Sequence, residues 1–181
     1  MLENLDKLNW KDYGIAHGDG THIPDTIKDL ASGISEKQQK AYWKLDNYIV
    51  LQSDLYEAAF YVVPFLFEIL QSDMTTGRDL VYDLLWEIAN GYADDIDIDV
   101  NGVTTPLREA CRVVVVDNLN IILAEVANYS SSFREKALEL LASLYEYRKE
   151  IEPKLIELCD EEPSSEFQAV IKKWIVELNE E

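Results

Sequence analysis

The stretch at residues 55–72, LYEAAFYVVPFLFEILQS, decides the expected fold. Its apolar residues recur at i, i+3, i+4 and i+7 spacing, which predicts a helix. One apolar face consists of Leu55, Ala58, Ala59, Val62, Leu66, Ile69 and Leu70, and a second consists of Phe60, Val63 and Phe67. A helix that is apolar on nearly every side is covered by neighbouring helices. Pro64 lies inside it and is expected to kink it.

The pattern of this stretch recurs along the chain. PFLFEIL at residue 64 aligns without gaps with PKLIELC at 153, PDTIKDL at 24 and NIILAEV at 120. Eight residues after each frame come Gln38, Arg78, Arg134 and Phe167, and each opens a second apolar pattern of helical spacing. Helix pairs repeated at about 40 residues are typical of HEAT or armadillo arrays, in which neighbouring pairs stack and the array curves.

These repeats predict an all-α fold, an α-α superhelix of four helix pairs in a right-handed solenoid. We expect one domain over residues 1–181, with residues 1–22 as an irregular lead-in. Ser35, Thr76, Ser132 and Ser165 are the expected helix N-caps, three of them as capping boxes. Thr105 is expected to cap a single long helix that continues to Val126, with Pro106 at its first position.

Residues 92–104, YADDIDIDVNGVT, interrupt the helical pattern. Apolar residues alternate with Asp97 and Asp99, and Asn101-Gly102 is a strong hairpin-turn signal, so we expect an inserted acidic β-hairpin. An alternative is the start of a calcium loop, D-x-[DN]-x-[DN]-G. Arg108 stands at its twelfth position, where a bidentate Glu is required. HGDGTH at residues 17–22 is expected to be a loop, with metal binding as its alternative.

The repeat frame resembles that of HEAT repeats, and REKALELL at residues 134–141 is its cleanest copy. The chain also looks like a family of bacterial HEAT-like, ARM-type proteins of undefined function. The matching pieces are W-x-x-YG-x-A at residues 10–16, the helix at Pro24, the Q-x-x-x-YEA…VPFL core at residues 52–70, and Gly91-Tyr92. The resemblance covers about the first 130 residues. It implies a fold but no activity, and Ser53-Asp54-Leu55 departs from the family's pattern.

The charge of the chain restricts its partners. It carries 35 Asp and Glu against 16 Lys and Arg, a formal charge of −19. This balance disfavours nucleic acid and anionic membranes, and it favours a basic protein or simply a solvated surface. Cys111 and Cys159 lie in apolar patterns and are expected to be buried thiols. With no signal peptide or membrane span, we expect a cytoplasmic monomer.

Catalytic motifs are missing from the sequence. It has no G-x-S-x-G, glycine-rich phosphate loop or C-x-x-C, and both of its histidines lie in loop sequence. Some HEAT-like proteins excise damaged DNA bases, but that activity goes with a cationic face. Others are bilin lyases, which no residue here specifically supports. We therefore predict a non-enzymatic protein with no cofactor and no metal.

A protein-binding solenoid remains as the predicted function. Aromatic residues anchor interfaces and carboxylates steer basic partners. The candidate partner-binding residues are Tyr82, Asp83, Trp86, Glu87, Asp94, Asp95, Asp97, Asp99, Glu139 and Glu146. Tyr82 and Trp86 have a core role as their alternative. One interpretation is an immunity protein that neutralises a basic toxin by charge mimicry. The alternatives are a general scaffold or regulatory adaptor and, third, a HEAT-like lyase.

Overall fold

The computed structural model describes residues 2–180 and divides the chain into two compact units. We call Met1–Val115 the N-terminal unit and Val116–Glu181 the C-terminal unit, and we describe each by itself. The two end residues, 1 and 181, lie outside the described part of the predicted 1–181 domain. The single-domain organisation stays a prediction.

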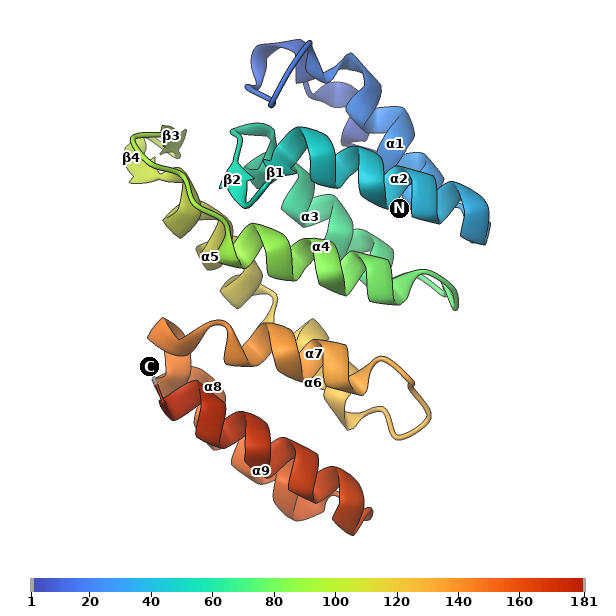
Figure 1. Ribbon diagram of the computed structural model, residues 1–181, viewed down its shortest axis with the longest axis vertical. Helices are drawn as coiled ribbons and strands as arrows, with labels where there is room; N and C mark the ends of the chain where they lie inside the picture. Colours follow the sequence, from blue (N-terminus) through green and yellow to red (C-terminus); the bar gives the residue numbers. More distant parts are fainter. Residues whose placement is uncertain (1, 181) are drawn as a thin grey trace. The chain divides into compact units, whose positions relative to one another are not determined.

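The N-terminal unit contains two helix pairs (Figure 1). Three 3-10 turns at Leu5–Lys7, Trp10–Asp12 and Gly20–His22 form the lead-in. They are followed by α1 (Ile23–Leu30), α2 (Ser35–Ile49), α3 (Ala58–Leu70) and α4 (Arg78–Asn90). Helix α1 packs on α2, α3 packs on α4, and α2 also contacts α4. The second helices of the two pairs therefore lie next to each other.

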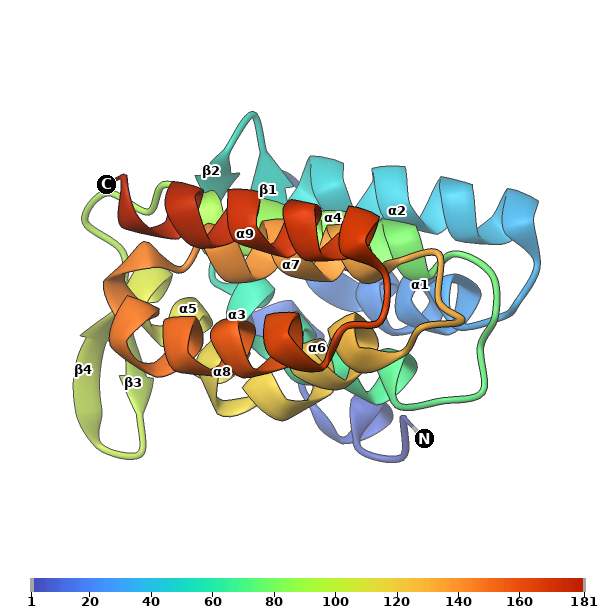
Figure 2. The ribbon, with the colours of Figure 1, turned by 90° about the horizontal axis from the view of Figure 1, so that it is seen from below.

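The C-terminal unit contains two more pairs. They are α6 (Leu119–Ala127) with α7 (Arg134–Ala142), and α8 (Arg148–Glu161) with α9 (Ser165–Asn179). A 3-10 turn at Tyr145–Tyr147 precedes α8. Contacts of α7 with α9 and of α6 with α8 arrange the four helices in two layers (Figure 2). The predicted all-α class and the four predicted helix pairs are confirmed.

Helix α3 is the most completely covered element of its unit. Nine of its residues are buried, from Ala58 to Leu70. Pro64 lies on its exposed side and, because proline has no amide hydrogen, gives no helical hydrogen bond to the carbonyl of Phe60. The predicted start at Leu55 is wrong. Leu55 belongs to a small ribbon of β1 (Val50–Leu51) and β2 (Asp54–Leu55), whose turn holds Gln52 and Ser53 at positive φ.

The predicted long helix after Thr105 is also wrong. Residues 103–106 form strand β4, so Pro106 ends a strand, and α5 begins one residue later (Leu107–Asp117). The backbone then leaves helical geometry at Asn118, with φ −105° and ψ 16°, before α6 begins. Residues 2–180 therefore contain nine α-helices instead of the eight predicted.

The predicted hairpin is confirmed. Strands β3 (Asp97–Val100) and β4 (Val103–Pro106) pair antiparallel, with Val100 opposite Val103. Asn101 and Gly102 connect them with φ values of 56° and 84°. Positive φ at both central residues is the type I′ geometry that Asn-Gly favours. The hairpin projects next to the N-terminal end of α5 (Figures 1 and 2).

The predicted N-caps of these four helices are wrong. The N-cap positions of α2, α4 and α7 are Ile34, Gly77 and Phe133, and none has a side-chain cap. In α9, Ser164 is the cap instead of Ser165, and its hydroxyl accepts from the amide of Phe167. In three of the four pairs, a polar side chain near the start of the second helix reaches back to the first helix.

Three of the pairs share one hydrogen bond at the same repeat position. Gln38 donates to the carbonyl of Leu30 (3.1 Å), Arg78 to that of Leu70 (2.9 Å), and Arg134 to that of Val126 (2.7 Å). Each bond satisfies a carbonyl at the C-terminal end of the first helix, where no intrahelical donor is available. In the fourth pair Phe167 stands at this position, and Gln168 instead donates to Glu162.

Candidate functional site

Three carboxylates converge where α2 packs on α4. Asp46 comes from α2, Asp83 and Glu87 come from α4, and all three are half-buried. Burial raises the pKa of Asp46. Burial also raises the pKa of Glu87, and the neighbouring charges of Asp46 and Asp83 raise it further. The charges of Asp46 and Asp83 therefore oppose the ionisation of Glu87 in a partly desolvated place.

Each of the two helices also carries a tryptophan near these carboxylates. Trp43 on α2 is 54% exposed, and Trp86 on α4 is half-buried. Helical spacing puts Asp46 three residues after Trp43 and Asp83 three residues before Trp86, so each pair shares a helix face. We call these five residues, Trp43, Asp46, Asp83, Trp86 and Glu87, the α2–α4 face. The combination of aromatic rings and carboxylates suits a basic protein partner.

Tyr82 does not belong to this face. Its side chain is 1% exposed and lies in the core of the N-terminal unit, which is the role that we named as its alternative. Successive residues of a helix are about 100° apart around its axis. Tyr82, one residue before Asp83, therefore points away from Asp83 and toward the core.

The hairpin carries the second group of predicted acidic residues. Asp94, Asp95, Asp97 and Asp99 are all exposed. The strand alternation puts Asp97 and Asp99 on one face of β3 and the buried Ile98 on the other. Asp99 accepts a hydrogen bond from the amide of Gly102 (2.9 Å). The pKa of Tyr61 on α3 is raised by burial, then by Tyr13 and Glu57, and last by Asp99. Asp99 therefore lies near α3.

Metal binding was the predicted alternative for the hairpin and for HGDGTH. Residues 2–180 hold no group of three or more His, Cys, Asp or Glu side chains placed to share a metal ion. His17 and His22 both pack against the ring of Tyr48, at 4.4 and 4.3 Å between centroids. Cys111 and Cys159 are free and buried, as predicted, and burial raises the pKa of Cys111 to about 12.

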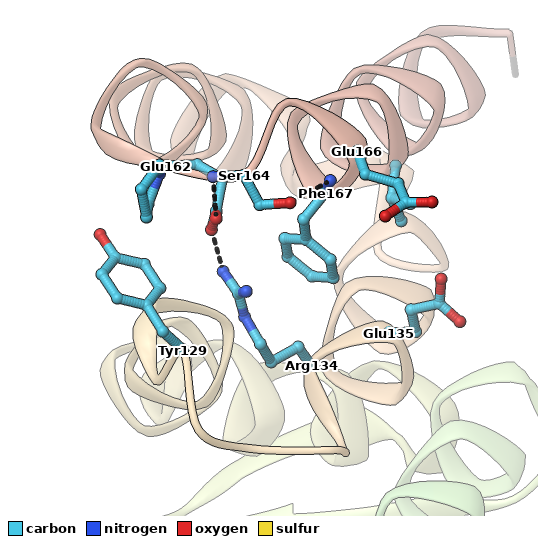
Figure 3. A pocket seen from close by; sticks show the side chains of 9 residues that line it. Tyr129, Arg134, Glu135, Glu162, Ser164, Glu166 and Phe167 are labelled. Atoms are coloured by element: carbon cyan, nitrogen blue, oxygen red, sulfur yellow. Dashed lines mark hydrogen bonds and ion pairs between the residues drawn. The ribbon is translucent and has the colours of Figure 1, made fainter.

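The C-terminal unit has an open pocket of about 580 Å³ between α7, the N-terminal end of α9 and the loop before α7. Figure 3 shows the side chains that line it. They are Tyr129, Arg134, Glu135, Glu162, Pro163, Ser164, Glu166, Phe167 and Val170. We call it the Arg134 pocket.

Arg134 is held on several sides. Its Nε donates to the carbonyl of Val126, and its Nη2 is bonded to Glu162 (Figure 3). Its guanidinium carbon lies 3.6 Å from the ring centroid of Phe167 and 5.2 Å from that of Tyr129. Burial raises the pKa of Glu162, but the bonds from Arg134 and the Ser164 amide outweigh burial, so the pKa is lowered overall.

The remaining predicted site residues of the C-terminal unit lie outside this pocket. Glu139 on α7 is half-buried and pairs with Lys136 at 3.4 Å. Glu146 is exposed in the 3-10 turn before α8. Asp46, Trp43 and the pocket were not predicted from the sequence. Applying to α2 the helical spacing that was applied to α4 could have found the first two residues.

Comparison with family models, with curated proteins and with solved structures found no match for this chain. Among residues 2–180, none of the helices has both the length and the apolar character that crossing a membrane requires.

Proposed function

We propose that this protein is a non-enzymatic, acidic helical-repeat protein that binds a basic protein partner through the α2–α4 face and the hairpin. The observation that carries the proposal is that Asp46 of α2 and Asp83 and Glu87 of α4 lie half-buried where the two helices pack, beside the exposed Trp43. Carboxylates held together at a cost in repulsion gain most from a cation that binds between them.

We also propose that the four helix pairs form a HEAT-like solenoid. The shared bond from Gln38, Arg78 and Arg134 to the end of the preceding helix supports this, because it gives three pairs the same physical junction. The contacts of α2 with α4 and of α7 with α9 support it within each unit, since stacked second helices are typical of such arrays.

The charge of −19 favours a strongly basic partner. A basic toxin neutralised by charge mimicry fits this chemistry, and the protein would then be an immunity protein of the cytoplasm. Exposed Trp43 and half-buried Trp86 supply apolar anchors beside the charges, which a purely solvating surface does not need.

The test compares two variants of equal charge. The first neutralises the face, Asp46→Asn/Asp83→Asn/Glu87→Gln, and the control neutralises three exposed acids elsewhere, Asp73→Asn/Glu157→Gln/Asp160→Asn. Proteins captured from the native host by the wild type are identified, and their association with each variant is measured by surface plasmon resonance over a range of salt concentrations.

We expect a basic partner whose association slows steeply with salt, because exposed charges are screened beyond about 8–10 Å near physiological ionic strength. The face variant should bind more weakly than the control. A partner that binds equally well in molar salt, or that loses the same affinity in both variants, contradicts the proposal.

A further inference from the structure

We propose that the Arg134 pocket binds one lysine or arginine side chain of the protein partner. The inference rests on the proposed function and names a second point of contact for the same partner, in the C-terminal unit. It starts from the charge of the lining, where three carboxylates face one guanidinium.

The guanidinium in the pocket is already neutralised. Arg134 is 8% exposed and is bonded to Glu162, which is 3% exposed. Glu135 and Glu166 are exposed lining residues that make no hydrogen bond or ion pair with any residue in the described part of the chain. Their two charges therefore set the sign of the pocket, which favours a cation over an anion.

The walls of the pocket fit the rest of a basic side chain. Phe167 and Val170 are half-buried, and Tyr129 is 57% exposed. Long basic side chains pack their methylene groups on apolar surface and leave the charged end beside acceptors. In Figure 3 the carboxylates of Glu135 and Glu166 lie at one edge of the pocket, with Phe167 between them and Arg134. A lysine or arginine can thus lie along Phe167 and reach both carboxylates.

The size and position of the pocket favour a side chain presented by a protein. A volume of about 580 Å³ lies inside the range of about 300–1,000 Å³ typical of ligand sites, and the pocket is open to the surface. Glu135 and Glu166 also lie in the first turns of α7 and α9, where negative charge stabilises a helix. If these two carboxylates only stabilise their helices, the pocket should bind no basic side chain. A titration therefore distinguishes helix stabilisation from binding.

The experiment titrates the full chain, labelled at valine methyl groups, with three capped tripeptides, acetyl-Gly-X-Gly-amide, in which X is arginine, lysine or citrulline. Citrulline matches arginine in shape and lacks its charge. We expect saturable shifts of the Val170 methyl signals with arginine and lysine and none with citrulline. In Glu135→Gln/Glu166→Gln the affinity should fall about tenfold, the size expected when charge-assisted hydrogen bonds are lost.

Two controls accompany the titration. Glu157→Gln/Asp160→Asn removes the same charge from exposed positions outside the lining and should change the affinity less than about twofold. Glu135→Asp/Glu166→Asp keeps both charges and should recover part of the binding. Equal loss in the lining and control variants, or equal shifts with citrulline, overturns the inference. Tighter binding of spermidine than of either peptide overturns the assignment to a protein side chain.

The outcomes distinguish this inference from the proposed function. If the captured partner is weakened by the α2–α4 face variant and not by Glu135→Gln/Glu166→Gln, the pocket inference fails and the proposed function stands. If the peptides bind but the face variant leaves capture unchanged, the face carries no partner and the proposed function fails.

Discussion

Gly91, at the C-terminal end of α4, has no room for a side chain. A Cβ there would lie 2.5 Å from Cγ and 2.9 Å from Cδ2 of Leu55, which β2 holds in the core. We predict that Gly91→Ala lowers the free energy of unfolding by about 1–3 kcal/mol through overpacking. Gly14→Ala is the matched control, because its Cβ would meet only Glu57, at 3.6 Å. Urea unfolding measures both, and equal losses would contradict the prediction.

His22 carries a second prediction at the scale of one residue. Both ring nitrogens are buried without a hydrogen-bond partner in the described part of the chain, and the ring packs edge-on against Tyr48. Burial lowers the pKa of His22, Lys44 and His17 lower it further, and Asp19 opposes them. The folded state therefore binds the proton less readily than the unfolded chain does. The stability that neutral His22 contributes is present above the unfolded pKa, about 6.5. It is lost as the pH falls through the lower pKa of the folded state.

We expect the urea midpoint of the wild type to fall from pH 7.5 to pH 5.5 by more than that of His22→Phe, which keeps a ring against Tyr48. The interval lies above the range where ordinary carboxylates titrate. His17→Gln is the control and should retain most of the fall. If the wild type and His22→Phe respond equally, His22 is not the titrating group.

At the scale of elements, the contact between α2 and α4 holds like charges together. Because the pKa of Glu87 is raised, its ionised form at pH 7 opposes folding. We predict that Glu87→Gln raises the urea midpoint at pH 7, and that the gain shrinks toward pH 4 as the wild-type carboxylates take up protons. Glu157→Gln on α8 should change little. A lower midpoint for Glu87→Gln would show that its charge stabilises the contact. A stabilising change that weakens partner binding is typical of functional sites.

The junction between α7 and the segment before α9 depends on a buried ion pair. The side chains of Arg134 and Glu162 are 10% and 2% exposed. Glu162→Gln leaves a buried guanidinium without its counter-charge, and we predict a loss of about 3 kcal/mol in unfolding free energy. Glu177→Gln breaks the exposed pair with Lys173 and should cost no more than about 0.5 kcal/mol. Denaturant titration at pH 7 measures both, and comparable costs would refute a structural role for Arg134–Glu162.

At the scale of the whole molecule, the charge of −19 acts on stability as well as on binding. Self-repulsion among carboxylates destabilises a folded chain, and salt screens it. We predict that the Tm rises when sodium chloride increases from about 20 to 300 mM, where the screening length falls below about 10 Å. The control variant Asp73→Asn/Glu157→Gln/Asp160→Asn should show a smaller rise. A Tm that is unchanged or lower in salt contradicts the prediction.

Particular residues show how far the sequence could predict the fold and the site. The periods of 3.6 and 2 located the helix pairs and the hairpin, and Asn101-Gly102 located the turn. The Ser and Thr caps failed, because local pattern does not fix a helix start to one residue: α2 begins at Ser35 itself and α7 begins two residues after Ser132. The bonds of Gln38 and Arg134 to carbonyls of the preceding helix were missed, because local pattern does not bring these groups near each other. Asp83 and Glu87 were found by spacing on α4. Their neighbour Asp46 on α2 was missed, because it is 37 residues from Asp83 in the chain and only packing brings them together.

The sequence by itself determined the all-α class, the four helix pairs, the acidic hairpin and the sign of the charge, since each depends on periodicity, turn chemistry or composition. Only the tertiary structure decided the ribbon at residues 50–55, the break at Asn118, the burial of Tyr82, the convergence of Asp46 with Glu87 and the Arg134 pocket. The physical reason is that burial, repulsion between carboxylates and hydrogen bonds across a helix pair depend on distances between residues that are far apart in the chain.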